Sequence, residues 1–156
     1  MSLITIPKKI YVKSVASEGE TELNAFDNCL IKAGLPQVSL IKVTSILPAD
    51  IELVNEPPSL PVGCNVPAIY AYIVSCNRNE KIAGAMALGW TDVGPTLVAE
   101  YAERNIDKRE AEKRALIRLE GMAKARGLKI TKKIVVSEEH VVEKCGCVLV
   151  IAAEVE

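Results

Sequence analysis

Two groups of reactive side chains stand out in this sequence, and each also has an ordinary structural interpretation. His140 is the single histidine, so a serine–histidine or cysteine–histidine relay would have to use it. Its neighbours are mostly glutamates in a stretch typical of a turn or strand end, which favours a solvated side chain. Cys145 and Cys147 are alternate residues and point the same way in a strand, but a zinc site needs about four ligands. We therefore expect ordinary buried thiols here.

The pair Thr44-Ser45 is the third candidate. It follows an apolar run at 38–43 and precedes Ile-Leu-Pro. Taken alone, this pair is typical of a strand that ends before a loop. The sequence carries no phosphate-binding loop, nucleophile elbow or dinucleotide fingerprint. A catalytic role for Ser45 must therefore come from the sequence around it.

The composition disfavours several classes of partner. The 156 residues suit one domain, and 19 basic against 20 acidic side chains create no global field toward nucleic acid or an anionic membrane. No apolar run approaches the roughly 18 residues of a membrane helix, and the N-terminus lacks a secretory signal. An odd count of five cysteines fits reduced thiols better than a disulfide framework, so we expect a cytoplasmic protein.

Apolar periodicity predicts a series of strands with two helices inserted. The strands are expected at 9–16, 38–43, 68–75, 82–90, 96–102, 130–136 and 147–155. The runs 68–75 and 82–90 flank a polar turn, which predicts a hairpin, and the last two runs are expected to pair. Two amphipathic helices can each cover a sheet face, so the order indicates a layered α+β domain.

Each helix has terminal signals and an apolar stripe. Thr21 can cap the first helix and Gly34 can end it. Asp107 can cap the second, which reaches Arg126 before Gly127. The predicted stripes are Leu23, Phe26, Leu30 and Ala33, then Ala111, Ala115, Leu119 and Met122. The many basic residues of the second helix are expected to form a solvated face.

Several short blocks occur in a distinctive order along nearly the whole chain. Residues 17–27 read SEGETELNAFD, and residues 43–48 read VTSILP. The later blocks are Pro61-Val62-Gly63, Val66-Pro67-Ala68, Ala99-Glu100-Tyr101, Glu139-His140, Val142-Glu143-Lys144 and Gly146-Cys147. In identity and order these blocks resemble the pyruvoyl-dependent arginine decarboxylase family.

The resemblance implies a precursor that cleaves itself between Thr44 and Ser45, giving a β chain of residues 1–44 and an α chain of residues 45–156. Ser45 would become a covalent pyruvoyl group, with no metal and no pyridoxal phosphate. Its ketone would form a Schiff base with the substrate amine and accept the electrons released as carbon dioxide leaves.

The resemblance also implies roles for three further residues. Glu100 matches the family's acid, and its apolar neighbours can raise a carboxyl pKa. Asp27 is the candidate partner for a substrate guanidinium. Ser39 stands where family members typically have an asparagine beside the pyruvoyl group. It lies six residues before Ser45 and so, in one strand, on the same face.

The family fold implied is a four-layer αββα sandwich, two sheets flanked by helices, assembled as trimers with active sites between neighbouring subunits. The function implied is conversion of arginine to agmatine and carbon dioxide. Two alternatives stay open: the same chemistry on another amino acid, and an unprocessed trimeric paralogue that binds a small cationic metabolite without turnover.

Overall fold

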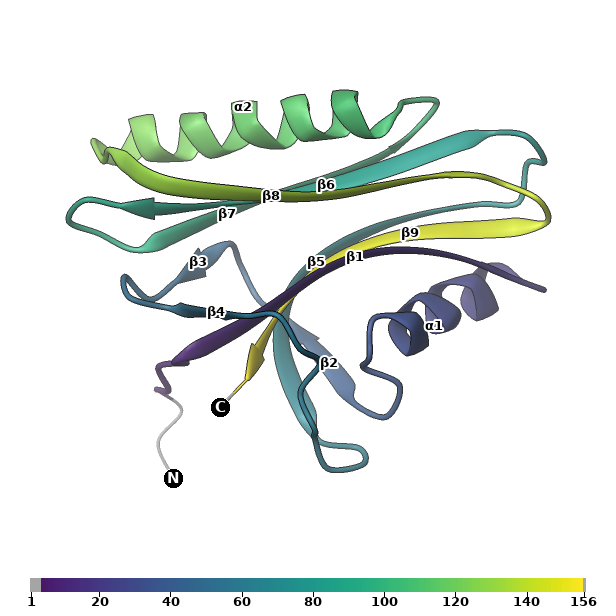
Figure 1. The fold of residues 1–156 in the computed structure, drawn as a ribbon, viewed down its shortest axis with the longest axis horizontal. Coiled ribbons are helices and arrows are strands. Elements are labelled where there is room, and N and C mark those ends of the chain that lie inside the picture. The colour runs from purple at the N-terminus through teal and green to yellow at the C-terminus, as the bar shows by residue number, and fades with distance from the viewer. Residues whose placement is uncertain (1–3, 156) are drawn as a thin grey trace.

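A computed structural model describes residues 4–155, which fold into four layers (Figure 1). Helix α2 covers a four-stranded sheet, a five-stranded sheet lies beneath it, and α1 packs on the far side of that second sheet. The helices are α1 (Glu22–Lys32) and α2 (Lys108–Arg126). The strands are β1 (Lys9–Gly19), β2 (Ser39–Lys42), β3 (Ile46–Leu47), β4 (Glu52–Val54), β5 (Asn65–Ser75), β6 (Lys81–Thr91), β7 (Thr96–Arg104), β8 (Ile130–Val141) and β9 (Cys145–Val155). The layered α+β prediction is confirmed.

Two predicted strand pairings are wrong. The strand order is β2-β5-β9-β1-β4 in one sheet and β3-β7-β6-β8 in the other. The expected hairpin partners, β5 and β6, therefore belong to different sheets, and so do β8 and β9. Strands buried on both faces read as continuous apolar runs, and such runs do not reveal which strand lies beside which.

The side chains of β6 show how the layers are packed. Its alanines, Ala83, Ala85 and Ala87, face α2, where small residues let the helix approach closely. The alternate residues Met86 and Leu88 fill the core between the two sheets. Since successive strand residues point to opposite faces, one strand serves two apolar layers.

Helix α1 begins and ends as predicted, and three residues of the predicted stripe, Phe26, Leu30 and Ala33, pack against the core, whereas Leu23 does not. Thr21 accepts a hydrogen bond from the backbone N–H of Asn24, and Gly34 follows the helix with φ +85°. Ala25 and Cys29 are fully buried, whereas Leu23 is 74% exposed. The helix lies so close to β1 that small side chains, and not the larger Leu23, occupy the contact.

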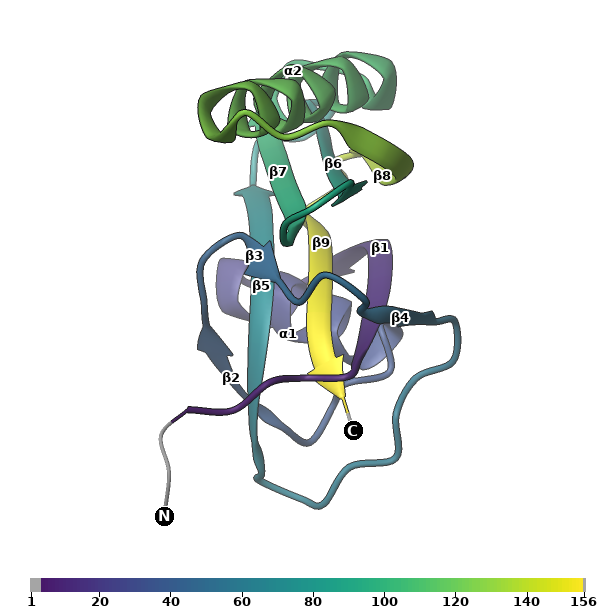
Figure 2. The same ribbon diagram turned by 90° about the vertical axis from the view of Figure 1, so that its left-hand side faces the viewer.

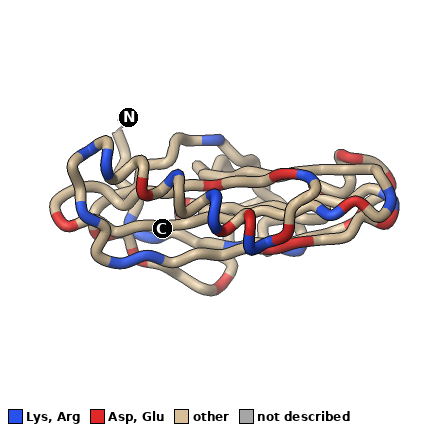
Figure 3. The backbone as a smooth tube through the Cα atoms, turned by 90° about the horizontal axis from the view of Figure 1, so that it is seen from above, with Lys and Arg blue, Asp and Glu red and all other residues tan. Residues whose placement is uncertain are grey.

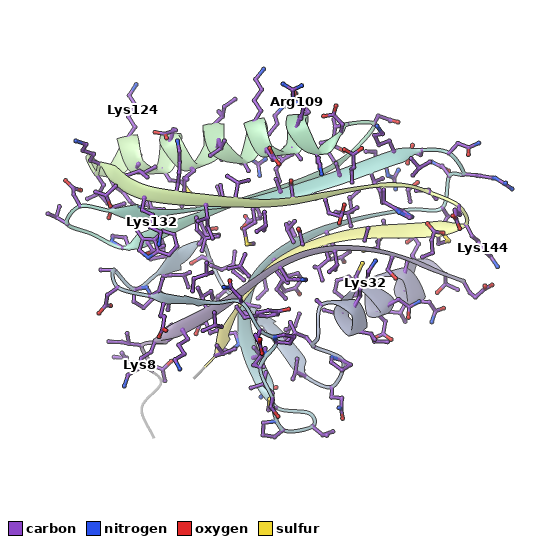
Figure 4. All side chains as sticks on the ribbon, in the orientation of Figure 1. Lys8, Lys32, Arg109, Lys124, Lys132 and Lys144 are labelled. Atoms are coloured by element: carbon purple, nitrogen blue, oxygen red, sulfur yellow. A yellow bond between two sulfur atoms is a disulfide. The ribbon has the colours of Figure 1, made fainter. Side chains whose placement is uncertain are left out.

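Helix α2 matches its prediction more closely. Asp107 accepts from the backbone N–H of Glu110, and Gly127 ends the helix with φ +66°. Ala111, Ala115, Leu119 and Ala123 are buried, and Met122 packs partly against them. Figure 4 shows Arg109 and Lys124 pointing away from the sheet, as a solvated basic face requires.

The cysteine prediction is wrong for two of the five thiols, because Cys76 and Cys145 form a disulfide. Ser75 of β5 lies opposite Gly146 of β9, so the next residues outward in the ladder meet, with their Cα atoms 4.0 Å apart. They are 69 residues apart in sequence, and only the strand pairing reveals their contact. Cys147 is a buried free thiol, as predicted.

Basic and acidic residues alternate over the surface, as their near-equal numbers suggest (Figure 3). Within the described residues, neither helix is long and apolar enough to cross a membrane.

Candidate active site at the Thr44–Ser45 peptide

The Thr44–Ser45 peptide lies where the chain passes from one sheet to the other. Strand β2 ends at Lys42 in the five-stranded sheet, and β3 begins at Ile46 in the four-stranded sheet (Figure 2). On the first side, the backbone N–H of Val43 donates to the Ala68 carbonyl of β5 at 3.0 Å. Residues 43–45 link the two sheets, and this hydrogen bond attaches the link to the first of them.

On the second side, Ser45 is attached to β7. The backbone N–H of Val98 donates to the Ser45 carbonyl at 3.0 Å, and Ile46 then pairs with Leu97. This bond lies downstream of the Thr44–Ser45 peptide. If that peptide breaks, residue 45 therefore stays bound to the sheet.

The Thr44 carbonyl has a hydrogen-bond donor of its own. The backbone N–H of Ile46 donates to it at 3.0 Å, which closes a tight turn around Ser45. A donor at this oxygen favours the negative charge that develops when a nucleophile adds to the carbonyl. Ser45 directly follows Thr44 and carries the hydroxyl that would attack this carbonyl. The residue is half-buried. The local geometry thus suits attack of Ser45 on the preceding peptide.

Glu100 shares a pocket of about 450 Å³ with Ser45. It lies on β7, two residues beyond Val98, so both side chains are on the same side of the strand. Its Oε2 atom is buried and accepts no hydrogen bond from residues 4–155. Burial raises the pKa of Glu100, against the opposing effects of its own backbone N–H and the charges of Lys42 and Arg118. Such a carboxyl can carry a proton at higher pH than an exposed one.

Two arginines of α2 complete the pocket wall, and the sequence prediction placed them on a solvated face. Arg118 and Arg126 both line the pocket that holds Ser45 and Glu100. The Arg118 Nη1 atom donates to the Glu100 carbonyl at 2.8 Å, and its guanidinium lies 4.7 Å from the Tyr101 ring centroid. Their spacing of eight residues puts them on one helix face, which is a weak sequence signal.

Two predicted site residues lie outside this pocket. Asp27 is exposed on α1, which packs against the opposite face of the five-stranded sheet. Ser39 is exposed at the start of β2. Contrary to the prediction, Ser39 and Ser45 do not share one strand face, because the strand ends at Lys42 and Ser45 precedes a strand of the other sheet.

His140 is the last residue but one of β8, near the strand end as predicted, but its side chain makes a contact within the fold and is not simply solvated. Its Nε2 atom lies 2.5 Å from Oε2 of Glu18 on β1. The same carboxylate accepts hydrogen bonds from the backbone N–H groups of Glu143 and Lys144. This cluster holds the β8–β9 turn against β1, and His140 does not line the Ser45 pocket.

Comparison with known proteins finds relatives that match nearly the whole chain. The model of the family "Pyruvoyl-dependent arginine decarboxylase (PvlArgDC)" matches residues 9–156. The chain is 40% identical to the pyruvoyl-dependent arginine decarboxylase of Methanothermobacter thermautotrophicus, over 92% of this chain and 93% of that protein. It is 38% identical to the enzyme of that name from Pyrococcus abyssi, over 89% of each chain. For the one from Methanocaldococcus jannaschii the identity is 37%, over 95% and 90%. The chain therefore belongs to the pyruvoyl-dependent arginine decarboxylase family.

Proposed function

We propose that this chain cleaves itself between Thr44 and Ser45 and then decarboxylates arginine to agmatine and carbon dioxide. The observation that carries the proposal is the hydrogen-bonded turn at residues 44–46, held between two sheets and next to the half-buried carboxyl of Glu100. Its products are a β chain of residues 1–44 and an α chain of residues 45–156.

Cleavage requires no reactant other than water. The Ser45 hydroxyl adds to the Thr44 carbonyl, the C–N bond breaks, and an ester replaces the amide. Loss of the Ser45 α-proton then breaks the Cβ–Oγ bond, which releases Thr44 as a carboxylate and leaves a dehydroalanine. Tautomerisation and hydrolysis release ammonia and leave a ketone at residue 45. The hydrogen bond from Ile46 to the Thr44 carbonyl favours the first step.

Membership of the family implies that this pyruvoyl group is the cofactor, and the residues around Ser45 fit it. The group supplies a ketone that takes up the substrate amine and an adjacent carbonyl that accepts electrons as carbon dioxide leaves. The Val98 N–H holds that adjacent carbonyl, which is the carbonyl of residue 45. Glu100, whose pKa is raised by burial, donates the proton that replaces the carboxylate on the substrate α-carbon.

The substrate guanidinium needs a carboxylate partner, and among the described residues the Ser45 pocket offers none besides the proposed acid. The Ser45 pocket contains two arginines and a single carboxylate, Glu100. Asp27 is exposed on a helix outside this pocket. We place Asp27 of a neighbouring copy at the mouth of the pocket, in a trimer with active sites between subunits. Ser39, exposed on β2, would act at the same boundary.

A cytoplasmic location stays a prediction, and it no longer rests on the cysteine count.

Intact-mass analysis of the purified chain tests the cleavage. We expect fragments of residues 1–44 and 45–156, the larger without a free amino terminus. The Ser45→Ala chain should stay whole, because alanine has no hydroxyl to attack Thr44. The Thr44→Ser chain is the matched control and should still cleave, since residue 44 leaves as a carboxylate. A wild-type chain that remains whole on long incubation would instead support a binding protein without turnover.

Carbon dioxide release from a panel of amino acids then tests the substrate. Arginine should give the highest kcat/KM, with stoichiometric agmatine. A higher value for another amino acid would keep the cleavage chemistry and remove arginine as the substrate.

A further inference from the structure

Arg118 presents an unpaired guanidinium to the candidate active site. Within residues 4–155 no carboxylate lies within the 4.0 Å of an ion pair from its guanidinium nitrogens. Arg114, one turn earlier, differs in this respect: its Nε atom is 2.9 Å from Oε1 of Glu110. Both guanidinium groups lie over the Tyr101 ring, yet only Arg118 lines the pocket.

The contacts of Arg118 fix its position without consuming its hydrogen-bonding capacity. One donor, Nη1, bonds the Glu100 carbonyl at 2.8 Å, and the Tyr101 ring supports the guanidinium plane. An arginine has five N–H donors in a rigid fork, so donors remain for a second acceptor. A carboxylate is the acceptor that this fork matches best, because two parallel hydrogen bonds can form.

The chemistry at residue 45 places such a carboxylate nearby. The substrate amine must reach residue 45, and the α-carbon must come within reach of Glu100. The carboxylate is attached to that same α-carbon, so it is confined to the pocket that Ser45 and Glu100 share with Arg118 and Arg126. These two cations also repel the substrate guanidinium and turn it toward the pocket mouth.

We propose that Arg118 binds the α-carboxylate of the amino-acid substrate, with Arg126 at the rim adding a second positive charge. This inference rests on the proposed function. When carbon dioxide leaves, Arg118 loses its partner and faces a product with greater positive charge. The same residue therefore attracts the substrate and repels the product.

The Arg118→Met chain tests this role, because methionine keeps helical propensity and removes the charge. A charge-assisted hydrogen bond contributes about 1.5–3 kcal/mol, so KM for arginine should rise about 10-fold to 100-fold. The carboxylate charge disperses as carbon dioxide forms, so Arg118 stabilises the bound substrate more than the transition state, and kcat should stay the same or rise. Inhibition by agmatine, which lacks the carboxylate, should not weaken. Arg118→Lys should restore part of the affinity for arginine.

Arg114→Met is the matched control, because Arg114 covers the same tyrosine ring outside the pocket; it should leave KM unchanged. If Arg118→Met blocks cleavage, the same question can be asked of uncleaved chains. Titration calorimetry then measures the binding of arginine and agmatine to Ser45→Ala precursors with and without Arg118→Met. Arginine affinity should then fall while agmatine affinity holds.

Three results would overturn the proposal. One is an unchanged KM in Arg118→Met. Another is an equal loss of affinity for arginine and agmatine. The third is a lower kcat with a shifted pH profile and unchanged KM, which would make Arg118 a positioning residue for Glu100. An uncleaved wild-type chain would instead refute the proposed function, and intact mass separates that failure from these.

Discussion

Replacing Glu100 by glutamine removes the proposed proton donor with little change of shape. A positioned general acid contributes about 100-fold to 10,000-fold, or roughly 3 to 5 kcal/mol of transition-state stabilisation. Part of the pocket wall is exposed, including Arg118 and Gly121, so water can partly replace the missing acid. We therefore expect kcat to fall by about 100-fold, the lower end of that range.

The pH dependence of the wild-type chain follows from the state of Glu100. Its pKa is raised by burial, and the acid must be protonated to donate. The rate kcat should therefore decline as the pH rises through this raised pKa, and the decline should be absent in Glu100→Gln. The charge of Lys42 lowers the pKa of Glu100, so Lys42→Met should move the decline to higher pH.

The Glu100→Gln substitution should also change the free energy of unfolding. Because the folded pKa of Glu100 lies above the unfolded value of about 4.3, its contribution is fully present below the unfolded pKa and is lost as pH rises through the folded pKa. Glu100→Gln should therefore gain stability relative to wild type only at the higher pH. Denaturant melts at both ends of this window measure the difference.

The assay is agmatine formation per pyruvoyl-containing chain, with intact mass giving the cleaved fraction. Glu103→Gln is the control, since Glu103 is exposed on the same strand and outside the pocket. A kcat for Glu100→Gln within threefold of wild type would refute Glu100 as the acid.

Two further predictions concern assembly and stability. Asp27→Asn should raise KM for arginine about 10-fold to 100-fold by removing a charge-assisted hydrogen bond. At an arginine concentration well below that raised KM, mixed oligomers of Asp27→Asn and Ser45→Ala chains should be more active than either chain alone, and no gain would place Asp27 within its own subunit's site. Cys145→Ser opens a loop of 69 residues to Cys76, so the free energy of unfolding should drop by up to about 4 kcal/mol in denaturant melts. Cys64→Ser, a free thiol, is the control, and equal losses would contradict a stabilising role for the disulfide.

The sequence alone was enough to predict the layered class and both helix boundaries. Thr21, Gly34, Asp107 and Gly127 act within a single turn of the chain, and their capping geometry depends on near neighbours. The ordered blocks around Ser45 indicated the family by themselves, because they occur along nearly the whole chain. The same resemblance indicated Glu100 as the acid, whereas its strand alone would have suggested a surface glutamate.

Only the tertiary structure decided which strands pair. Runs such as β5 and β6 are apolar on both faces, and period-two alternation that would mark an exposed face is therefore missing. The disulfide between Cys76 and Cys145 depended on that pairing. So did the separation of Ser39 from Ser45, since the strand breaks where the chain changes sheets.

The pocket itself is also a tertiary property. Ser45, Glu100 and Arg118 come from three elements, and each looked ordinary in sequence: a strand-end serine, a surface glutamate and a solvated helix arginine. Packing of α2 along β7 brings Arg118 to the Glu100 carbonyl, whereas the Glu100 side chain is on the same side of β7 as Val98, which is buried between the two sheets. Local sequence determines which residues can react, whereas proximity and burial, which set the pKa and the charge around Ser45, arise only when distant segments pack.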